Sequence, residues 1–270
     1  MSALSLALDT PDLAQHYERA SVDRQFKTGK QLIERLAIGT GDRVLDVGSG
    51  TGLLAAHVAK LVGATGSVHA IDPLPLRIEI AKRKAEGQPN LQFSVDNAYD
   101  LRSFADASFD AVYLNAVFHW FPEKLAPLVN FQRLLKPGGK LGISTGSKQH
   151  KNRIHDLQRE VLAREPYERY IRPEQGLPQR VSAEELRALL EESRFEVQSI
   201  SVEPHTTYHA NAAAAIEHSQ ASSFGNLLGH LPEALRERAR QEIALALDQF
   251  RTPEGIRQDG ARIIAVAIKR

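Results

Sequence analysis

The sequence contains no cysteine among its 270 residues. Disulfide bonds, thiolate metal sites and cysteine nucleophiles are therefore excluded. The sequence also lacks any apolar run approaching the roughly 18 residues of a membrane-spanning helix. Its first residues, 1–10, lack the basic stretch and the long apolar run of a secretory signal. We therefore expect a cytoplasmic protein without a membrane partner.

An excess of charge of either sign is also missing. The 34 basic and 33 acidic residues give a formal net charge of +1. Nucleic-acid binding usually needs a basic excess gathered on one face, because phosphate contacts supply much of the affinity. The basic run 82–84 would point in different directions on a helix, which favours a solvated face. The charge balance thus predicts a small-molecule partner and no nucleic-acid partner.

Strand-like and helical patterns alternate through the first half of the chain. After a helical pattern at 12–38 and a Gly-rich turn, short β-branched runs alternate with amphipathic stretches. We predict strands at 43–47, 67–71, 91–95, 109–115 and 140–145, with helices at 51–62, 73–86 and 123–135. Such alternation is typical of a parallel sheet with helices on both faces.

The regular alternation of strands and helices ends after residue 146. A helix is expected at 152–164, and Ser182 with Glu185 forms a capping box that opens another. A strand follows at 195–202, then helical patterns at 212–228 and 232–250, and a last strand at 261–268. We divide the chain into an N-terminal helical cover (1–42), a core (43–146), helices with a sixth strand (147–204), a helical lid insertion (205–258) and the last core strand (259–270).

The sharpest motif, VLDVGSGTG, joins the first strand to its helix through Gly48, Gly50 and Gly52. Ligands of open α/β sheets lie beyond the carboxyl ends of the strands, and glycine lets the backbone approach them closely. A dinucleotide fingerprint would need glycine where Leu53 stands, and the lysine of a phosphate loop is absent. With Asp46 just ahead, the turn suits a ligand with a cationic amino-acid tail.

Two further strands also end in acids. Asp72 ends the second strand, where a carboxylate can accept hydrogen bonds from both hydroxyls of a ribose. The third strand runs into Asp96 and Asn97, where a carboxylate can accept from an adenine amino group. Capping of the next helix by Asp72 and a solvated loop position for Asp96 remain alternatives.

With these motifs in this order, the chain resembles the class I S-adenosylmethionine-dependent methyltransferases of small molecules. The resemblance is carried by VLDVGSGTG (44–52), AIDP (70–73), VDNAYDL (95–101), SFDAVYLNAVFHW (108–120) and LLKPGGKLGIST (134–145). It implies a Rossmann-like, mostly parallel sheet of seven strands whose last strand runs antiparallel. It also implies S-adenosylmethionine as cofactor, with the methionine moiety at Asp46 and the glycine loop, the ribose at Asp72 and the adenine at Asp96 and Asn97.

The expected site extends to residues beside these motifs. The cofactor-binding residues that we expect are Asp46, Gly48, Ser49, Gly50, Gly52, Asp72, Pro73, Asp96, Asn97, Ala98 and Asn115. The substrate-binding residues that we expect are Tyr17, His119, Trp120, Tyr208 and Phe224. The aromatic residues of this set have core packing as an alternative.

His119 is the candidate catalytic residue. It follows the fourth strand, where a histidine can take a proton from a substrate hydroxyl or amine. The alternative, which we favour, is a residue that shapes the wall of the pocket. His205 and His209 are four residues apart, but no third ligand is evident and we predict no metal.

The sequence therefore predicts transfer of a methyl group to oxygen, nitrogen or carbon of a small molecule. A tRNA or protein methyltransferase and a non-catalytic cofactor-binding subunit remain alternatives, and we expect a monomer or homodimer. Because the first three strand tips are assigned to the cofactor, we expect substrate choice to reside in 147–181, 205–258 and the N-terminal helices. A connection as long as 205–258 is more often a functional lid than a passive loop.

Overall fold

The structure, a computed structural model, describes residues 10–150, 152–170, 178–222 and 227–270. The chain divides into two compact units. The larger unit, which we call the sheet unit, contains Val22–Ser147, Gln179–Glu203 and Arg262–Arg270. The smaller, the helical unit, contains Lys148–Pro178 and Pro204–Ala261 together with the chain up to Ser21.

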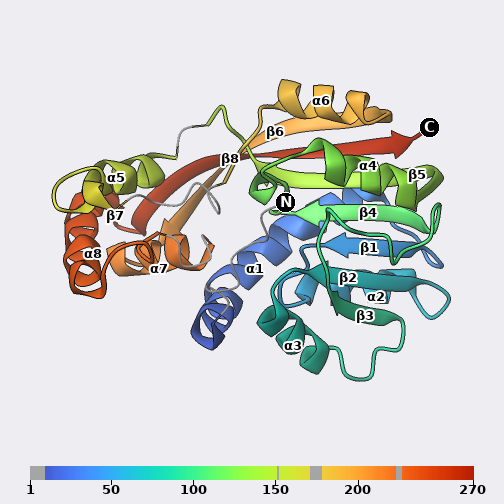
Figure 1. Ribbon diagram of the computed structural model, residues 1–270, viewed down its shortest axis with the longest axis horizontal. Helices are drawn as coiled ribbons and strands as arrows, with labels where there is room; N and C mark the ends of the chain where they lie inside the picture. Colours follow the sequence, from blue (N-terminus) through green and yellow to red (C-terminus); the bar gives the residue numbers. More distant parts are fainter. Residues whose placement is uncertain (1–9, 151, 171–177, 223–226) are drawn as a thin grey trace. The chain divides into compact units, whose positions relative to one another are not determined.

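The sheet unit is built on strands that alternate with helices along the chain. The strands are β1 (Arg43–Val47), β2 (Ser67–Asp72), β3 (Leu91–Val95), β4 (Phe109–Asn115), β5 (Leu135–Gly146), β6 (Phe195–His209) and β8 (Gly255–Lys269). Their order across the sheet is β3-β2-β1-β4-β5-β8-β6 (Figure 1). The pairs among β1 to β5 are parallel, and β8 runs antiparallel to β5. The predicted seven-stranded, mostly parallel sheet is confirmed, with a two-residue strand β7 (Arg251–Thr252) added beside β8.

Two apolar clusters cover the faces of this sheet. Because side chains alternate along a strand, Leu45 and Val47 of β1 enter one cluster and Val44 enters the other. The first cluster takes residues from α4 (Leu125–Leu134) and α6 (Ala183–Glu192). The second takes residues from α1 (Pro11–Leu36), α2 (Leu53–Val62) and α3 (Pro75–Lys84). The helices therefore lie on both faces, as predicted, and the first turn of α6 carries the predicted capping box of Ser182 and Glu185.

The helical unit has an apolar cluster of its own. It packs α5 (Arg153–Leu162), α7 (Ala212–Ser222) and α8 (Glu233–Leu247) around buried residues such as Ile154, Ile216 and Ile243. Short 3-10 turns, η3 (Tyr167–Arg169) and η4 (Asp248–Phe250), follow α5 and α8. Residues from both of the segments expected to choose the substrate, 147–181 and 205–258, thus share one core.

Three strands differ from their predicted bounds by more than one residue. The sixth strand runs to His209, so 205–209 are strand and not part of a helical insertion. The predicted strand ends before Pro204. Proline is tolerated inside β6 because this is an edge strand, which needs fewer ladder N–H groups. The last strand begins at Gly255 rather than at 261, and pairs through its first residues with β7. The fifth begins at Leu135, through the predicted turn, with a register shift opposite Phe109.

In the part of the chain that the structure describes, no helix has the length and apolarity to cross a membrane.

Candidate functional site

The glycine loop lies between β1 and α2, where the sequence placed it. Gly48, Gly50 and Gly52 have φ angles of 78°, 57° and 83°, in the left-handed region that glycine adopts at little cost. A Cβ on Gly48 would lie 2.3 Å from a methyl carbon of Val117, and one on Gly52 would lie 2.6 Å from the Phe93 ring. Backbone angle and space therefore both require glycine at this turn.

The N–H groups of the loop are tied to the end of β2. Those of Gly48 and Ser49 donate to the carbonyl of Ile71 at 2.7 and 2.9 Å, and that of Gly50 donates to Asp72 Oδ2 at 2.9 Å. These donors are already engaged, unlike those of a phosphate-binding loop, which point at the ligand. The arrangement agrees with the argument from spacing that this loop does not serve a pyrophosphate.

Asp72 lies at the carboxyl end of β2 and joins two elements. Besides the bond from Gly50, its Oδ1 accepts from the N–H of Leu74 at 3.0 Å, at the start of α3. Its exposure is 4%. Asp72 is not the N-cap of α3, because that position is Leu74 and carries no side-chain cap. Its two bonds leave room for ribose binding, because a carboxylate has about four lone-pair sites. Pro73 follows it, partly buried, ahead of α3.

Asp46 lies on β1 beside Tyr113 of β4, its partner in the parallel register. Tyr113 Oη donates to Asp46 Oδ2 at 2.7 Å, and the two residues are 0% and 2% exposed. Burial raises the pKa of the Asp46 carboxyl to about 7, while the bond from Tyr113 lowers it and the nearby Asp72 raises it further. A cationic ligand group beside this carboxyl would favour its ionised form.

Asp96, Asn97 and Ala98 follow β3 in a tight turn. Asp96 Oδ1 accepts from the N–H of Asn97 at 2.8 Å, and Asn97 Oδ1 accepts from that of Tyr99 at 2.9 Å. Ala98 is buried, whereas Asn97 is exposed. The turn is thus rigidly formed at the same edge of the sheet as Asp72, whose carbonyl accepts from the N–H of Asp96.

Two buried polar atoms near the loop have no hydrogen-bond partner among the described residues. They are the Ser49 hydroxyl and Asn115 Oδ1. Buried polar atoms are normally paired, so these two mark a place where a ligand would complete the bonding. With the glycine turn and the buried Asp46 and Asp72, the residues present fit the amino-acid and ribose parts of S-adenosylmethionine.

The second half of α1 packs against Asn115, a contact that the sequence did not predict. Asn115 Nδ2 donates to the carbonyl of Gln25 at 3.0 Å. A Cβ on Gly29 would lie 2.5 Å from a methyl carbon of Leu54 and 3.0 Å from Asn115 Nδ2. A glycine inside a long helix signals such a close approach. Tyr113 was missed as well, although a tyrosine inside a buried strand needs a partner for its hydroxyl.

His119 and Trp120 occupy η2 (Phe118–Trp120), directly after β4. His119 Nδ1 lies 3.1 Å from Thr145 Oγ1 of β5, and the His119 carbonyl accepts from the N–H of Gln179 at 2.6 Å. Lys124 Nζ donates to the carbonyls of Phe118 and Phe121, at 3.2 and 2.6 Å. Contacts from Thr145, Gln179 and Lys124 thus fix this turn, as expected for a rigid wall of a pocket.

The remaining predicted residues lie in the helical unit or outside the described residues. Tyr208 is 47% exposed on β6, and His209 Nε2 lies 2.7 Å from Gln258 Oε1. Phe224 lies outside the described residues, as does the side chain of Tyr17 in α1. Within the described part of the chain, no cluster of three histidine or acidic residues suits a metal ion.

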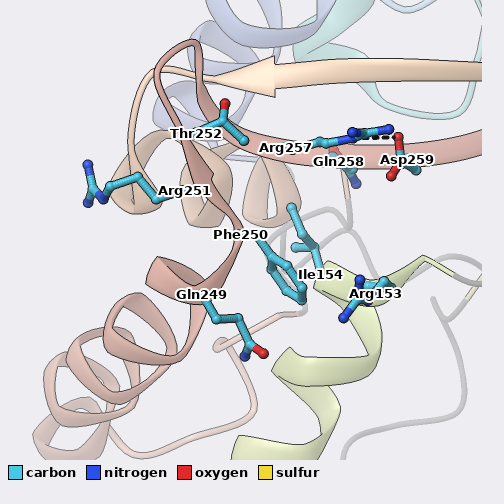
Figure 2. Close-up of a pocket in the computed structure, with 9 residues that line it drawn as sticks. All are labelled: Arg153, Ile154, Gln249, Phe250, Arg251, Thr252, Arg257, Gln258 and Asp259. Carbon is cyan, nitrogen blue, oxygen red and sulfur yellow. Dashed lines mark hydrogen bonds and ion pairs between the residues drawn. The ribbon is translucent and has the colours of Figure 1, made fainter.

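A cavity of about 370 Å³ lies within the helical unit (Figure 2). Three arginines of its lining already have partners. Arg251 pairs with Asp248 at 2.6 Å, Arg257 pairs with Asp259 at 3.1 Å, and Arg153 lies 4.9 Å from the centre of the Phe250 ring. This pairing makes the cavity a weaker candidate for a site than the glycine loop.

Comparison with known families identifies the class. Residues 45–143 match the family described as methyltransferase domain. This segment begins in β1 and ends in β5, so it contains the glycine loop, Asp72, Asp96 and His119. The matched segment belongs to that family, and the chain has the class I, Rossmann-like fold of the S-adenosylmethionine-dependent methyltransferases.

Individual relatives agree with this class. The chain is similar to aklanonic acid methyltransferase DauC of Streptomyces sp. strain C5, with 31% identity over 48% of this chain and 59% of the relative. It is similar to a ubiquinone biosynthesis O-methyltransferase of Xanthomonas oryzae pv. oryzae, with 41% identity over 39% of this chain and 43% of the relative. The chain thus spans about half the length of these relatives. The YcgJ protein of Bacillus subtilis shares the fold, with a TM-score of 0.63 at 18% identity over 90% of this chain and 98% of that one.

Proposed function

We propose that the protein is an S-adenosylmethionine-dependent methyltransferase that acts on a small-molecule acceptor. The observation that carries the proposal is the left-handed glycine turn beside two buried carboxylates, Asp46 and Asp72. In this proposal Asp46 and the loop hold the methionine part, Asp72 the ribose, and the Asp96–Ala98 turn the adenine. Asn115 and Ser49 complete the bonding of the amino-acid tail.

The cofactor supplies a methyl group on a positively charged sulfur, which an acceptor oxygen, nitrogen or carbon displaces. The chain's own contribution is to align the reactants and exclude water. His119 and Trp120 form a wall on the side of β4 and β5, fixed by Thr145, Gln179 and Lys124. We assign His119 to this wall rather than to base catalysis.

A small molecule is favoured as acceptor for two reasons. The formal net charge of +1 supplies no basic excess for binding RNA. Two relatives carry small-molecule names: one is an aklanonic acid methyltransferase and the other a ubiquinone biosynthesis O-methyltransferase. Transfer to oxygen, as in the relatives named O-methyltransferase, is the first reaction to test.

The direct test is calorimetry with S-adenosylmethionine and S-adenosylhomocysteine, followed by transfer of a labelled methyl group. The acceptors would be a panel of phenols, carboxylic acids and amines, with bulk tRNA and a protein mixture as the alternative classes. Tight cofactor binding with transfer to small molecules is expected. Transfer only to tRNA or protein would refute the acceptor class, and failure to bind the cofactor would refute the whole proposal.

The helical unit is expected to choose the acceptor. Deleting α7 and α8 would expose the buried Ile154 and Val161 of α5, which pack in the same cluster, so point substitutions are the better test. Tyr208→Ala, in the helical unit, should raise the KM for the acceptor and leave cofactor affinity unchanged. Trp120→Ala tests the wall at η2, in the sheet unit, and should have the same effect. Tyr170→Ala, at another exposed tyrosine of the helical unit, is the matched control. An unchanged KM in both variants would contradict these two roles.

A further inference from the structure

The pair formed by Asp46 and Tyr113 is unusual for its burial. The two residues face each other across β1 and β4 and are 2% and 0% exposed. The hydrogen bond from Tyr113 Oη to Asp46 Oδ2 is 2.7 Å long. An ionised carboxylate in such surroundings is costly unless a cation or several donors compensate for the lost water.

Among the described residues, the groups that act on Asp46 come from two neighbouring strands and include no cation. Tyr113 of β4 donates its hydrogen bond, and Asp72 of β2 adds negative charge nearby. Burial and the adjacent Asp46 raise the pKa of Tyr113 well above its ordinary value, so the phenol stays neutral and remains a donor. In the absence of a ligand, burial therefore favours a protonated Asp46 below about pH 7.

We propose that this pair couples cofactor binding to the release of one proton. At slightly acidic pH, Asp46 is a neutral carboxylic acid in the ligand-free protein. It ionises when the cationic amino-acid tail of the cofactor binds: the O–H bond breaks, the electron pair stays on the carboxylate oxygen, and the proton passes to the buffer. Tyr113 is the positioning residue that keeps donating to the carboxylate. The inference rests on the proposed function, which brings a cation to this carboxyl.

Linkage then fixes the pH dependence of binding. Where Asp46 of the free protein is protonated, each pH unit of rise should strengthen binding about tenfold. Above the pKa of Asp46 the affinity should no longer change with pH. Because its pKa is about 7, the change should fall between about pH 6 and pH 8.

Calorimetry with S-adenosylhomocysteine tests this without any turnover, since this molecule carries the same amino-acid tail. Binding heats would be compared in two buffers of different ionisation enthalpy. Nearly one proton should be released at about pH 6 and nearly none at about pH 8. Equal heats in the two buffers at about pH 6 would overturn the inference. Binding without proton release thus refutes the inference alone, whereas no binding at any pH refutes the proposed function.

Variants separate Asp46 from other groups that titrate. Asp46→Asn should bind without releasing the proton. Tyr113→Phe removes a donor that favours the carboxylate, so proton release should persist to higher pH. Tyr99→Phe is the matched control, because Tyr99 Oη also donates a hydrogen bond, to the carbonyl of Glu123, in the same unit. Unaltered proton release in Asp46→Asn would overturn the assignment.

A second measurement covers the case in which Asp46→Asn fails to fold or bind. Carbon-13 NMR of the aspartate carboxyls follows protonation in the ligand-free wild-type protein and in Tyr113→Phe. One carboxyl should titrate near neutral pH, and its pKa should be higher in Tyr113→Phe than in the wild type. If every aspartate carboxyl titrates below about pH 5, as ordinary aspartates do, the inference is wrong.

Discussion

Replacing Asp72 with alanine should cost the protein stability as well as cofactor affinity. The carboxylate accepts hydrogen bonds from the N–H groups of Gly50 and Leu74, at 2.9 and 3.0 Å, in a position that is 4% exposed. Each buried donor left without an acceptor costs about 1–3 kcal/mol. Asp72→Ala should therefore lower the unfolding free energy by roughly 2–6 kcal/mol, a large part of the roughly 5–15 kcal/mol of an ordinary domain.

Urea unfolding measures the first effect and calorimetry with S-adenosylmethionine the second. Asp72→Asn should lie between wild type and Asp72→Ala, because one acceptor oxygen remains. Asp96→Ala is the matched control at the end of the adjacent strand: Asp96 accepts from its neighbour Asn97 in a more exposed turn. Its unfolding free energy should change by less than about 1 kcal/mol.

Two separate results would refute this reasoning. An unchanged urea midpoint in Asp72→Ala would show that the carboxylate does not hold the glycine loop to α3. An affinity loss below the roughly 1.5 kcal/mol expected for a hydrogen bond to a charged group would remove Asp72 from ribose binding. Affinity should be measured well below the unfolding midpoint, so that loss of folded protein is not read as loss of binding.

Three further substitutions test the site. Gly52→Ala should lower the unfolding free energy by about 1–3 kcal/mol more than Gly87→Ala does, as measured by urea unfolding. Both glycines have positive φ, but only a Cβ at Gly52 would press on the Phe93 ring, at 2.6 Å. Equal losses in the two variants would show that this contact does not matter. His119→Asn should lower turnover by less than about tenfold, and a loss of the roughly 10²–10⁴-fold typical of acid–base catalysis, with binding intact, would show that His119 is a base. The raised pKa of Asp46 predicts that the unfolding free energy of the ligand-free protein falls by roughly 3 kcal/mol as pH rises from about 4 to about 7. That dependence should be absent from Asp46→Asn, and its persistence there would assign it to another group.

The sequence alone determined the parallel-sheet half of the protein, residues 43–146. Strand and helix periods in 43–146 predicted the parallel sheet because the elements there are short and regular, and several are bounded by glycine or proline. The loop at Gly48–Gly52 could be placed because its glycines are forced by left-handed backbone angles, a requirement local to the turn. Asp72 and Asp96 could be placed because parallel strands bring their carboxyl ends to one edge.

The tertiary structure decided what depends on distant neighbours. The bond from Tyr113 to Asp46 joins residues 67 positions apart, and no local pattern reveals that strand register sets them opposite each other. The extension of β6 past Pro204 depends on its position at the edge of the sheet, which sequence periodicity does not encode. The approach of α1 to Asn115 depends on how a helix packs on the sheet. Local backbone preference depends on adjacent residues, so the sequence predicts it directly. Strand pairing, burial and the pKa of a buried acid depend on residues that are remote in the sequence and that exclude water only after folding.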